Sequence, residues 1–352
     1  MKAKIIGAGS IGNHLAQASR RLGWEVTLID VDPEALRRSR EEIYPKRYGA
    51  WDSGIRLVTA DQEPRGGFDI IFIGTPPDIR MSLAVRALEE KPKILQLEKP
   101  LCAPTLEGLD QFLEQYYAQK DTLAVVGYDH GVAESVEAMI GLLKSRAIGE
   151  VETLDVEFRE HWQGIFSAHP WLKGPQDSYL GFWQRGGGAA GEHSHALHLW
   201  QLLAKEAGLG VWSKIASVMD MRRVDGAEYD AIASFSILTD KNKIGRVVQD
   251  VVTLPVRKWA RLQSKEGFIE WHCGGHPEGD LLRWGIKSGA LQEKIFSKKR
   301  PDDFYREVLH IRDILEKKVN PLDSPISLES GVAVMKVVSA AHQHRNSGAI
   351  AV

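Results

Sequence analysis

The sequence predicts a two-domain protein that combines an α/β domain with an α+β domain. Its 352 residues exceed one ordinary domain and are enough for two. Up to about residue 127, short β-branched runs alternate with amphipathic helical stretches, and from about residue 151 alternating polar and apolar runs dominate. We therefore expect a doubly wound parallel sheet in residues 1–127 and a mostly antiparallel sheet domain in residues 128–352, whose C-terminal helices are able to pack back on the first domain.

In the first domain, β-branched runs predict six strands and the stretches between them predict four helices. Gly23 is expected to cap the first helix, and Asp32 followed by Pro33 is expected to begin the second. The expected strands are residues 3–6, 25–30, 55–59, 68–74, 93–97 and 122–127, and the expected helices are residues 10–22, 33–44, 78–90 and 105–119.

In the second domain, alternation predicts strands with one covered face, interrupted by one helix. The helix, over residues 192–207, carries an unusual cluster of histidines. The expected strands are residues 151–158, 213–221, 231–238, 246–253 and 268–271, and two more helices are expected at residues 304–317 and 328–342.

The composition excludes several classes of partner. Forty-five Lys and Arg against 47 Asp and Glu give a net charge of -2, which favours neither nucleic acid nor an anionic membrane as a partner. No apolar run approaches the ~18 residues that span a bilayer. The two cysteines, Cys102 and Cys273, form no CxxC pair, so neither a disulfide framework nor a cysteine metal site is expected. Because the first strand pattern begins near residue 4, we expect no signal peptide and a cytoplasmic protein.

A glycine motif joins the first expected strand to the first expected helix. Its glycines permit a tight turn, close approach of the backbone to a pyrophosphate and close helix packing, which predicts a Rossmann domain. Asp30 ends the second strand, where its carboxylate accepts hydrogen bonds from a ribose 2′-OH and repels a 2′-phosphate, so we expect NAD rather than NADP. The alternatives are a glycine turn without ligand and a surface acid at Asp30. The motif residues expected to bind NAD are Gly7, Gly9, Ser10, Ile11 and Gly12.

Four motifs in order resemble one enzyme family. After the glycine motif come Gly74-Thr75-Pro76-Pro77 and Glu98-Lys99-Pro100, both at carboxyl ends of expected strands, then a glycine-rich stretch over residues 187–195 and a segment over residues 325–331. Together they resemble the Gfo/Idh/MocA family of oxidoreductases, named for glucose-fructose oxidoreductase and inositol dehydrogenase, over nearly the whole chain. The resemblance implies an open-faced sheet in the second domain, with a sugar or polyol substrate held between that sheet and the nicotinamide.

The resemblance also implies roles for individual residues. Thr75, Pro76, Pro77, Glu98 and Lys99 fall in the segments expected to contact NAD. Lys99 matches the family lysine that contacts the reacting hydroxyl, where an ammonium stabilises developing negative charge, and the bond to Pro100 is open to a cis form.

His195 matches the catalytic histidine, a general base in oxidation and an acid in reduction. Family members commonly carry an aspartate three residues later, but this chain has His198 there. Either His198 replaces the aspartate as a substrate contact or proton partner, or Glu192 supplies the carboxylate. Zinc binding by Glu192, His193, His195 and His198 is a further alternative, which the spacing does not favour, so no metal is expected.

Aromatic and polar residues before the glycine-rich stretch are candidates for the substrate side. Trp162, Trp171 and His161 have the character of a sugar-pocket wall, and ordinary core or interface packing is the alternative for each tryptophan. Asp129 and His130 follow the sixth strand where family members often carry an arginine; they are candidates for the cleft or for capping the domain junction.

Three classes of function follow. The first is NAD-dependent oxidation of a sugar, inositol or related polyol, or the reverse reduction. The second is an NAD-dependent glycosidase or epimerase with transient redox, and the third is a non-catalytic sugar or nucleotide sensor, which the presence of Lys99 and His195 disfavours. The resemblance also implies a homodimer or homotetramer.

Overall fold

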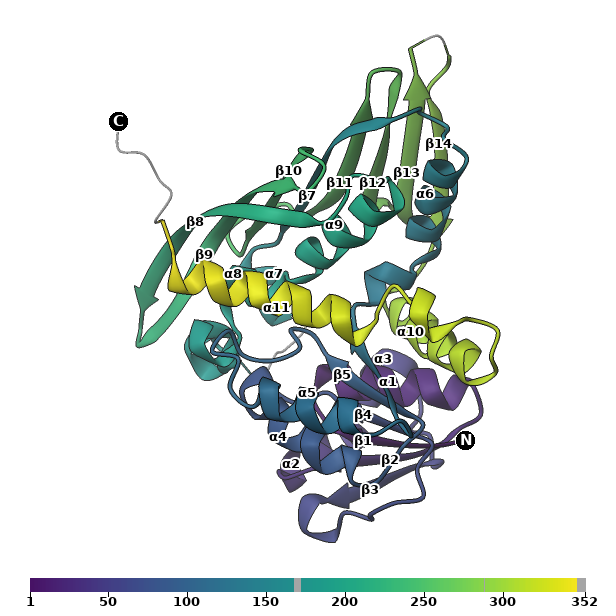
Figure 1. The fold of residues 1–352 in the computed structure, drawn as a ribbon. Helices are drawn as coiled ribbons and strands as arrows, with labels where there is room; N and C mark the ends of the chain where they lie inside the picture. Colours follow the sequence, from purple (N-terminus) through teal and green to yellow (C-terminus); the bar gives the residue numbers. More distant parts are fainter. Residues whose placement is uncertain (168–171, 288, 347–352) are drawn as a thin grey trace. The chain divides into compact units, whose positions relative to one another are not determined.

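The computed structural model describes residues 1–167, 172–287 and 289–346, and the chain forms two compact units (Figure 1). Unit 1 comprises Met1–Asp129 and Arg300–Gly331, and unit 2 comprises His130–Lys299 and the chain from Val332 onward. The boundary expected between residues 127 and 128 lies two residues before the end of the first stretch. Residues 300–331 return to unit 1, so the C-terminal segment contributes to both units.

Unit 1 is built on a six-stranded parallel sheet with the strand order β3-β2-β1-β4-β5-β6. All six expected strands are present. The order reverses between β1 and β4, the switch point at which open α/β sheets bind ligands outside the carboxyl ends of their strands. The strands are β1 (Lys2–Ile6), β2 (Glu25–Asp30), β3 (Ile55–Thr59), β4 (Ile70–Ile73), β5 (Ile94–Glu98) and β6 (Leu123–Gly127).

Helices connect most consecutive strands of this sheet, whereas a 3-10 turn and a loop lie between β3 and β4. Gly23 ends the first helix with φ +74°, and the Asp32 side chain accepts a hydrogen bond from Glu34 N, as expected. The helix expected over residues 33–44 is shorter and continues through a π-helical turn, Ser39–Ile43, into α3. The helices of unit 1 are α1 (Ser10–Arg21), α2 (Pro33–Arg38), α3 (Tyr44–Tyr48), α4 (Pro77–Leu88), α5 (Leu109–Ala118) and α10 (Arg300–Leu315), the last packing against α1.

The core of unit 1 contains a cluster of ion pairs around Lys4. The apolar positions of β1, β4 and β5 are buried, as strands covered on both faces require. Lys4 of β1 is also fully buried, and its Nζ lies 2.6 Å from Glu90 Oε1 and 3.0 Å from Glu63 Oε1. A buried ammonium is stable only with such partners.

Unit 2 is built on an eight-stranded sheet with the strand order β14-β13-β12-β11-β7-β10-β9-β8. Among the eight strands that the structure describes here, β7 and β10 pair in parallel and the other pairs are antiparallel, so the sheet is mostly antiparallel, as expected. Three of its strands, β11, β13 and β14, lie outside the predicted set. The strands are β7 (Val151–Arg159), β8 (Trp212–Val224), β9 (Ala227–Thr239), β10 (Ile244–Asp250), β11 (Arg257–Ser264), β12 (Gly267–His276), β13 (Gly279–Ile286) and β14 (Gln292–Ser297).

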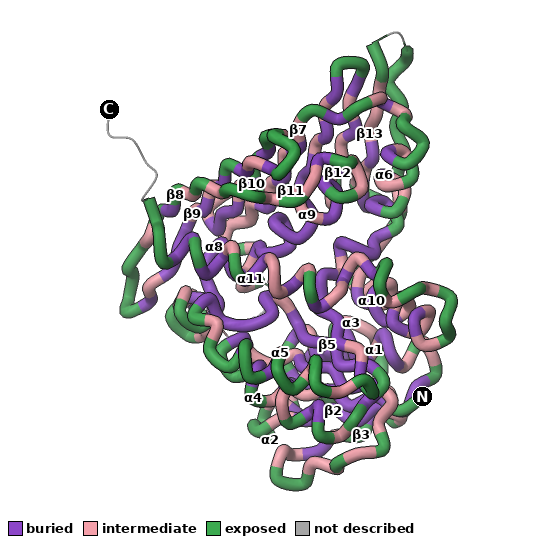
Figure 2. Tube along the Cα trace, in the orientation of Figure 1, coloured by how far each residue is buried: buried purple, intermediate pink, exposed green. Residues whose placement is uncertain are grey.

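Helices cover one face of this sheet. Helix α8 packs on β9 and β10, α9 on β7 and β10, and α6 on β12 and β13. Figure 2 shows the burial that results along these helices and the strands beneath them. The helices are α6 (Glu134–Lys144), α7 (Trp162–Ser167), α8 (Gly188–Glu192), α9 (His195–Glu206) and, from Val332 onward, α11 (Leu328–Gln343); α6, α7 and α8 lie outside the predicted helices.

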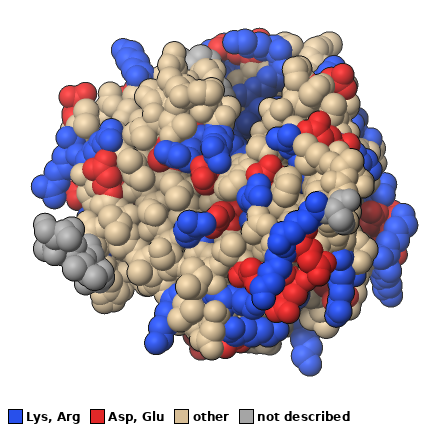
Figure 3. All heavy atoms as spheres, turned by 90° about the horizontal axis from the view of Figure 1, so that it is seen from above, with Lys and Arg blue, Asp and Glu red and all other residues tan. Residues whose placement is uncertain are grey.

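Charged side chains of both signs are interspersed on the face drawn in Figure 3. Within the residues that the structure describes, no helix is both long enough and apolar enough to cross a membrane.

Candidate functional site

The glycine motif forms the turn between β1 and α1, and steric demands explain its glycines. A Cβ on Gly12 would lie 1.8 Å from the carbonyl oxygen of Gly7, so α1 approaches the turn only because this position is glycine. Gly9 differs, because its Cβ would meet no atom within 4 Å. Gly9 is also the N-cap of α1, and no side-chain hydrogen bond caps this helix end. The turn therefore leaves open space beside first-turn N–H groups, which fits a dinucleotide pyrophosphate.

Asp30 is fixed at the end of β2 beside this turn. Its Oδ2 accepts a hydrogen bond of 2.7 Å from Ala8 N, and its Oδ1 accepts one of 2.9 Å from Asp32 N. Asp30 is half-buried, so it is not a freely solvated surface acid. Each carboxylate oxygen retains acceptor capacity, so the residue is able to hold the glycine turn and accept from a ribose hydroxyl at once.

The two motif segments at the ends of β4 and β5 are tied together by Arg80 of α4. This side chain is 2% exposed, and its guanidinium donates to three backbone carbonyls. The Glu98 carbonyl accepts at 2.6 Å, and the Thr75 and Pro100 carbonyls accept from the same group. One buried cation thus brings the Thr75 and Lys99 segments to the same edge of the sheet. No local sequence pattern predicts this role of Arg80.

Lys99 follows β5 directly, and its position depends on Glu98. The Lys99–Pro100 peptide bond is cis, the form left open by the sequence. Glu98 Oε2 accepts a hydrogen bond of 3.0 Å from Lys99 N. Pro77 is the first residue of α4, and Pro76 is the N-cap of this helix. The residues of unit 1 expected at the cofactor therefore lie at the carboxyl ends of β1, β2, β4 and β5.

In unit 2, the glycine-rich stretch folds as the short helix α8 on a buried carboxylate. Asp230 of β9 is fully buried, and its Oδ2 accepts a hydrogen bond of 2.6 Å from Ala190 N. Gly188 has φ +78°, and a Cβ there would lie 2.0 Å from Asp230 Oδ1. Burial raises the pKa of Asp230 to about 7, although backbone hydrogen bonds oppose the shift. The role of Asp230 is not predictable from sequence, because no neighbouring residue marks it as a partner of α8.

His195 is the first residue of α9 and lies among aromatic rings. It is 9% exposed, and its ring stands edge-on to that of His130 with centroids 4.8 Å apart. Phe158 of β7 stacks beside it at 6.1 Å, and Trp271 contacts His130 at 5.8 Å. A histidine base in such surroundings is held in one orientation. His130 therefore packs directly against the His195 ring, whereas the sequence suggested it only for the cleft or the domain junction.

The remaining polar residues of this stretch differ in burial. His198 lies one turn after His195 on α9 and is 1% exposed, whereas Glu192 at the end of α8 is half-buried. His193 is buried, and its carbonyl accepts a hydrogen bond from the Gln249 side chain. Asp129, the other polar candidate, begins a 3-10 turn after β6 and is half-buried.

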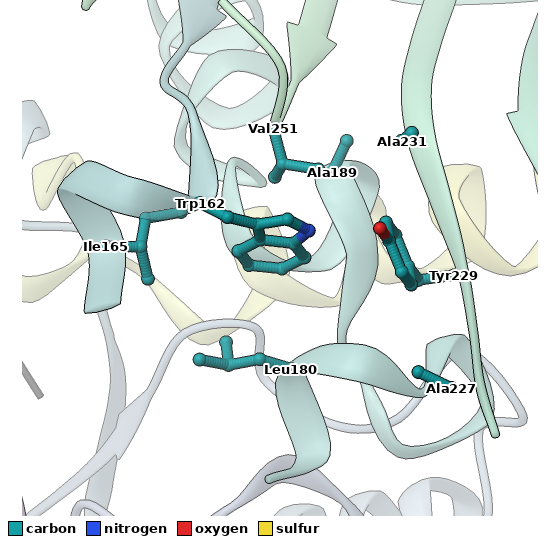
Figure 4. Close-up of a cluster of buried hydrophobic side chains, with 8 residues drawn as sticks. All are labelled: Trp162, Ile165, Leu180, Ala189, Ala227, Tyr229, Ala231 and Val251. Atoms are coloured by element: carbon teal, nitrogen blue, oxygen red, sulfur yellow. The ribbon is translucent and has the colours of Figure 1, made fainter. Parts of the chain in front are cut away.

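Trp162 belongs to a hydrophobic cluster of unit 2 (Figure 4). It is 8% exposed, stacks on Phe166 at 5.2 Å and meets the edge of Tyr229 at 5.5 Å. This is the packing role that the sequence left open as an alternative to substrate binding. His161 lies half-buried before α7, and Trp171 lies outside the described residues. The cluster consists of Trp162, Ile165, Leu180, Ala189, Ala227, Tyr229, Ala231 and Val251.

The C-terminal motif segment packs on the edge of the unit 1 sheet. Val126 N donates to the Ile326 carbonyl at 2.9 Å, and Ser327 bridges Val125. A Cβ on Gly331 would lie 2.6 Å from Val126 Cγ2, which explains a glycine in the first turn of α11. This motif therefore has a structural role in joining the C-terminal segment to β6.

Several solved structures share this fold at low sequence identity. Levoglucosan dehydrogenase in complex with NADH and L-sorbose aligns over 99% of this chain and 97% of its own, with a TM-score of 0.75 and 16% identity. The aldose-aldose oxidoreductase from Caulobacter crescentus, in complex with glycerol, aligns over 99% and 98%, with a TM-score of 0.74 and 16% identity. The super-repressor mutant of Gal80p from Saccharomyces cerevisiae aligns over 99% and 96%, with a TM-score of 0.78 and 12% identity.

A family model matches the N-terminal part of the sequence. A search among curated proteins gives no match to this sequence. Residues 1–128 match the model described as the Gfo/Idh/MocA oxidoreductase family, NAD-binding Rossmann fold. This range contains the glycine turn, Asp30, the Thr75 segment and Lys99. Residues 1–128 are therefore similar to the NAD-binding Rossmann domain of the Gfo/Idh/MocA oxidoreductases.

Proposed function

We propose that the protein is an NAD-dependent dehydrogenase that transfers a hydride between nicotinamide and a carbinol or keto carbon of a sugar, inositol or related polyol. The observation that carries the proposal is the open space at Gly9, beside a carboxylate held by the glycine turn itself. The substrate class is supported by the levoglucosan dehydrogenase complex with L-sorbose, whose fold this chain shares.

The chain's own residues provide binding and proton handling. NAD supplies the hydride acceptor when bound. First-turn N–H groups of α1 bind its pyrophosphate, and Asp30 accepts from the adenosine ribose. Lys99 stabilises negative charge on the substrate oxygen as its proton leaves, because an ammonium attracts an alkoxide. His195 takes that proton in oxidation and returns it in reduction.

His198 and Glu192 are the two candidates for the group that assists His195. A histidine cannot supply the fixed negative charge of an aspartate, so the two residues predict different pH dependence. Replacing the assisting residue shifts the pH limb that reports the base, whereas replacing the other changes kcat without moving it. Pairwise comparison of His198→Ala and Glu192→Ala in pH-rate profiles assigns the role.

Cofactor binding is tested by adding the missing Cβ at Gly9. Gly9 has φ -73° and open space around its Cβ, so Gly9→Ala fits the folded chain. The new methyl occupies the space proposed for the pyrophosphate, and we expect NADH binding by fluorescence to weaken at least about tenfold with an unchanged Tm. Gly141→Ala in α6, which also meets no atom within 4 Å, is the matched control and should bind NADH normally. Equal affinity in both variants would contradict the cofactor site.

Catalysis is tested by screening polyols and sugars with NAD for formation of NADH. For an active substrate, Lys99→Met and His195→Asn should each lower kcat by roughly 100-fold or more, and NADH affinity should stay near that of the wild type in His195→Asn. Wild-type kcat in both variants would show that neither residue acts in the reaction.

Two other functions are separated by the same screen. Gal80p shares this fold and is named in its structure as a repressor, so the fold alone does not imply catalysis. A non-catalytic sensor would bind NADH and ligand without any turnover. An epimerase or glycosidase would convert substrate without net NADH, because the cofactor is regenerated in each cycle.

We also propose that the protein is a homodimer or homotetramer built on the uncovered face of the unit 2 sheet. Six side chains of alternating charge pair across six adjacent strands on this face, with Arg246 2.5 Å from Asp155 and Arg261 2.7 Å from Glu270. A row that alternates in sign matches itself when turned by a two-fold axis, as an isologous interface requires. The row is Arg246, Asp155, Arg261, Glu270, Arg283 and Glu293.

Light scattering after size exclusion tests this assembly. Glu270→Arg places three like charges next to one another in the row and should shift the protein toward monomer. Glu114→Arg on the exposed surface of α5 is the control and should leave the mass unchanged. A monomeric wild type would overturn the proposed assembly.

A further inference from the structure

Two carboxyl groups are buried together beneath the Lys99 turn in unit 1. Glu98 ends β5 and is 4% exposed, and Glu307 of α10 is fully buried. A Cβ on Gly127 would lie 2.5 Å from Glu98 Oε1 and 3.2 Å from Glu307 Oε1, so both oxygens face the same space beside this glycine. Their separation is therefore below about 6 Å, the range in which like charges strongly affect each other.

Among the described residues, hydrogen bonds satisfy one carboxylate oxygen of each of these two residues. Glu98 Oε2 accepts from Lys99 N, and Glu307 Oε1 accepts from the side chain of Gln96. Glu98 Oε1 and Glu307 Oε2 are buried without a hydrogen-bond partner among the described residues. A buried carboxylate oxygen without a donor is costly, and one proton on the pair removes part of that cost.

The surrounding charges do not neutralise two carboxylates. Asp129 and Asp303 add negative charge near the pair, whereas Arg80 and Lys99 are the cations that face Glu98. Burial raises the pKa of Glu98 to about 7, and burial together with Glu98 raises that of Glu307 well above its ordinary value. The pair therefore retains a proton at neutral pH.

We propose that Glu98 and Glu307 share one proton, and that Glu307 is a positioning residue which holds Glu98, and through it the Lys99 turn, in place. The inference rests on the proposed function of Lys99. Glu307 arrives from a helix more than 200 residues later in the chain, and Gln96 fixes it to β5. Loss of the shared proton at alkaline pH puts two negative charges side by side and loosens the turn.

The kinetic test compares amide and alanine replacements at Glu307 over pH 6–10. Glu307→Gln imitates the protonated acid and keeps an acceptor for Gln96, so kcat near pH 7 should stay within about threefold of the wild type. In this variant Glu98 is the one member of the pair that ionises, so two negative charges never lie side by side. The alkaline limb of its kcat profile should therefore move to higher pH by about one pH unit or more. Glu307→Ala loses the support at every pH, and kcat should fall about tenfold.

Asp313→Asn is the matched control, because it makes the same acid-to-amide change on α10 beside Arg312. Its alkaline limb should coincide with that of the wild type. An unmoved limb in Glu307→Gln, or equal shifts in both variants, overturns the positioning role. A simple packing role would lower kcat equally at all pH values and leave the limb in place.

Infrared spectroscopy of the protein without cofactor or substrate tests the shared proton independently of activity. At pH 8, the wild type should show the carbonyl stretch of a protonated carboxyl group that is absent from Glu307→Gln. Absence of this band from the wild type overturns the shared proton. This result stands if no substrate is found, so failure of the proposed dehydrogenase activity is recognised separately.

Discussion

Asp230 and His342 are buried side by side in unit 2, and replacing Asp230 with Asn should change how stability depends on pH. Asp230 Oδ1 lies 3.6 Å from His342 Nε2, longer than a hydrogen bond, and both side chains have no exposed surface. An ion pair would lower the pKa of Asp230 and raise that of His342. Burial does the opposite, raising the pKa of Asp230 to about 7 and lowering that of His342 to about 4. We therefore expect both groups to be neutral in the folded protein at mildly acidic pH.

The two shifts act on stability with opposite signs. Asp230 binds its proton more tightly when folded, so its contribution is complete below pH 4 and is lost by about 4 kcal/mol as pH rises through 7. His342 holds its proton less tightly when folded, so its contribution is present above pH 6.5 and is lost by about 3 kcal/mol as pH falls through 4. In the wild type these two opposite dependences of stability on pH nearly cancel.

Replacing either residue removes its contribution to the pH dependence of stability. Asp230→Asn keeps an oxygen for Ala190 N, so its stability should match the wild type near pH 4 and exceed it by about 3–4 kcal/mol at pH 8. His342→Phe keeps the ring that stacks on Trp183 at 4.6 Å and should gain about 3 kcal/mol over the wild type as pH falls from 7 to 4.

Guanidinium unfolding at pH 4–8, followed by tryptophan fluorescence, measures both differences. The difference between variant and wild type cancels all other titrating groups, provided that the m-value is unchanged. An ion pair would give another outcome: Asp230→Asn would lose several kcal/mol between pH 4 and 7, and the wild type would be most stable there. That result would refute the view that burial controls these two groups.

Three further variants test the packing that supports the two candidate sites. Lys4→Met removes the buried ammonium from two half-buried carboxylates, those of Glu63 and Glu90, and should cost about 2–3 kcal/mol in unfolding experiments, whereas the exposed Lys2→Met should be near neutral. Arg80→Lys loses the fork that spans three carbonyls, so its Tm and NADH affinity should both fall, unlike those of the exposed Arg86→Lys. Gly188→Ala combines a positive φ with a clash against Asp230 and should destabilise unit 2 by at least about 1 kcal/mol in the same assay; an unchanged midpoint would contradict the glycine requirement.

Unit 1 was predicted almost completely because its signals are local. A buried parallel strand needs only a short β-branched run, and a helix start such as Asp32-Pro33 is written in adjacent residues. The interruption of the second helix at Ser39–Ile43 was not predicted, because Ser39 bonds to the Ala8 carbonyl and to Asn13, which only the folded turn brings near.

The second sheet was predicted less well because its uncovered face is charged. In β11, Arg257 and Arg261 lie on strand positions where the expected signal is a β-branched residue, and cross-strand acids stabilise them. In β14 almost every residue is exposed, so alternation gives no contrast between two faces. These strands are recognisable by pairing partners, which a single sequence does not reveal.

The buried charged residues of both units follow one common rule. Lys4, Glu98 and Asp230 each lie within or next to an expected strand, where the pattern assigns burial, and each is in fact buried. A charge at such a position requires a buried partner, so its presence in a strand is itself a prediction that one exists. The partner's identity is not local: Lys4 bonds to a residue 86 positions away, Asp230 to one 40 positions away, and the Glu307 beside Glu98 reaches its strand across 211 positions. Local pattern therefore locates these charges, and only the fold selects their partners.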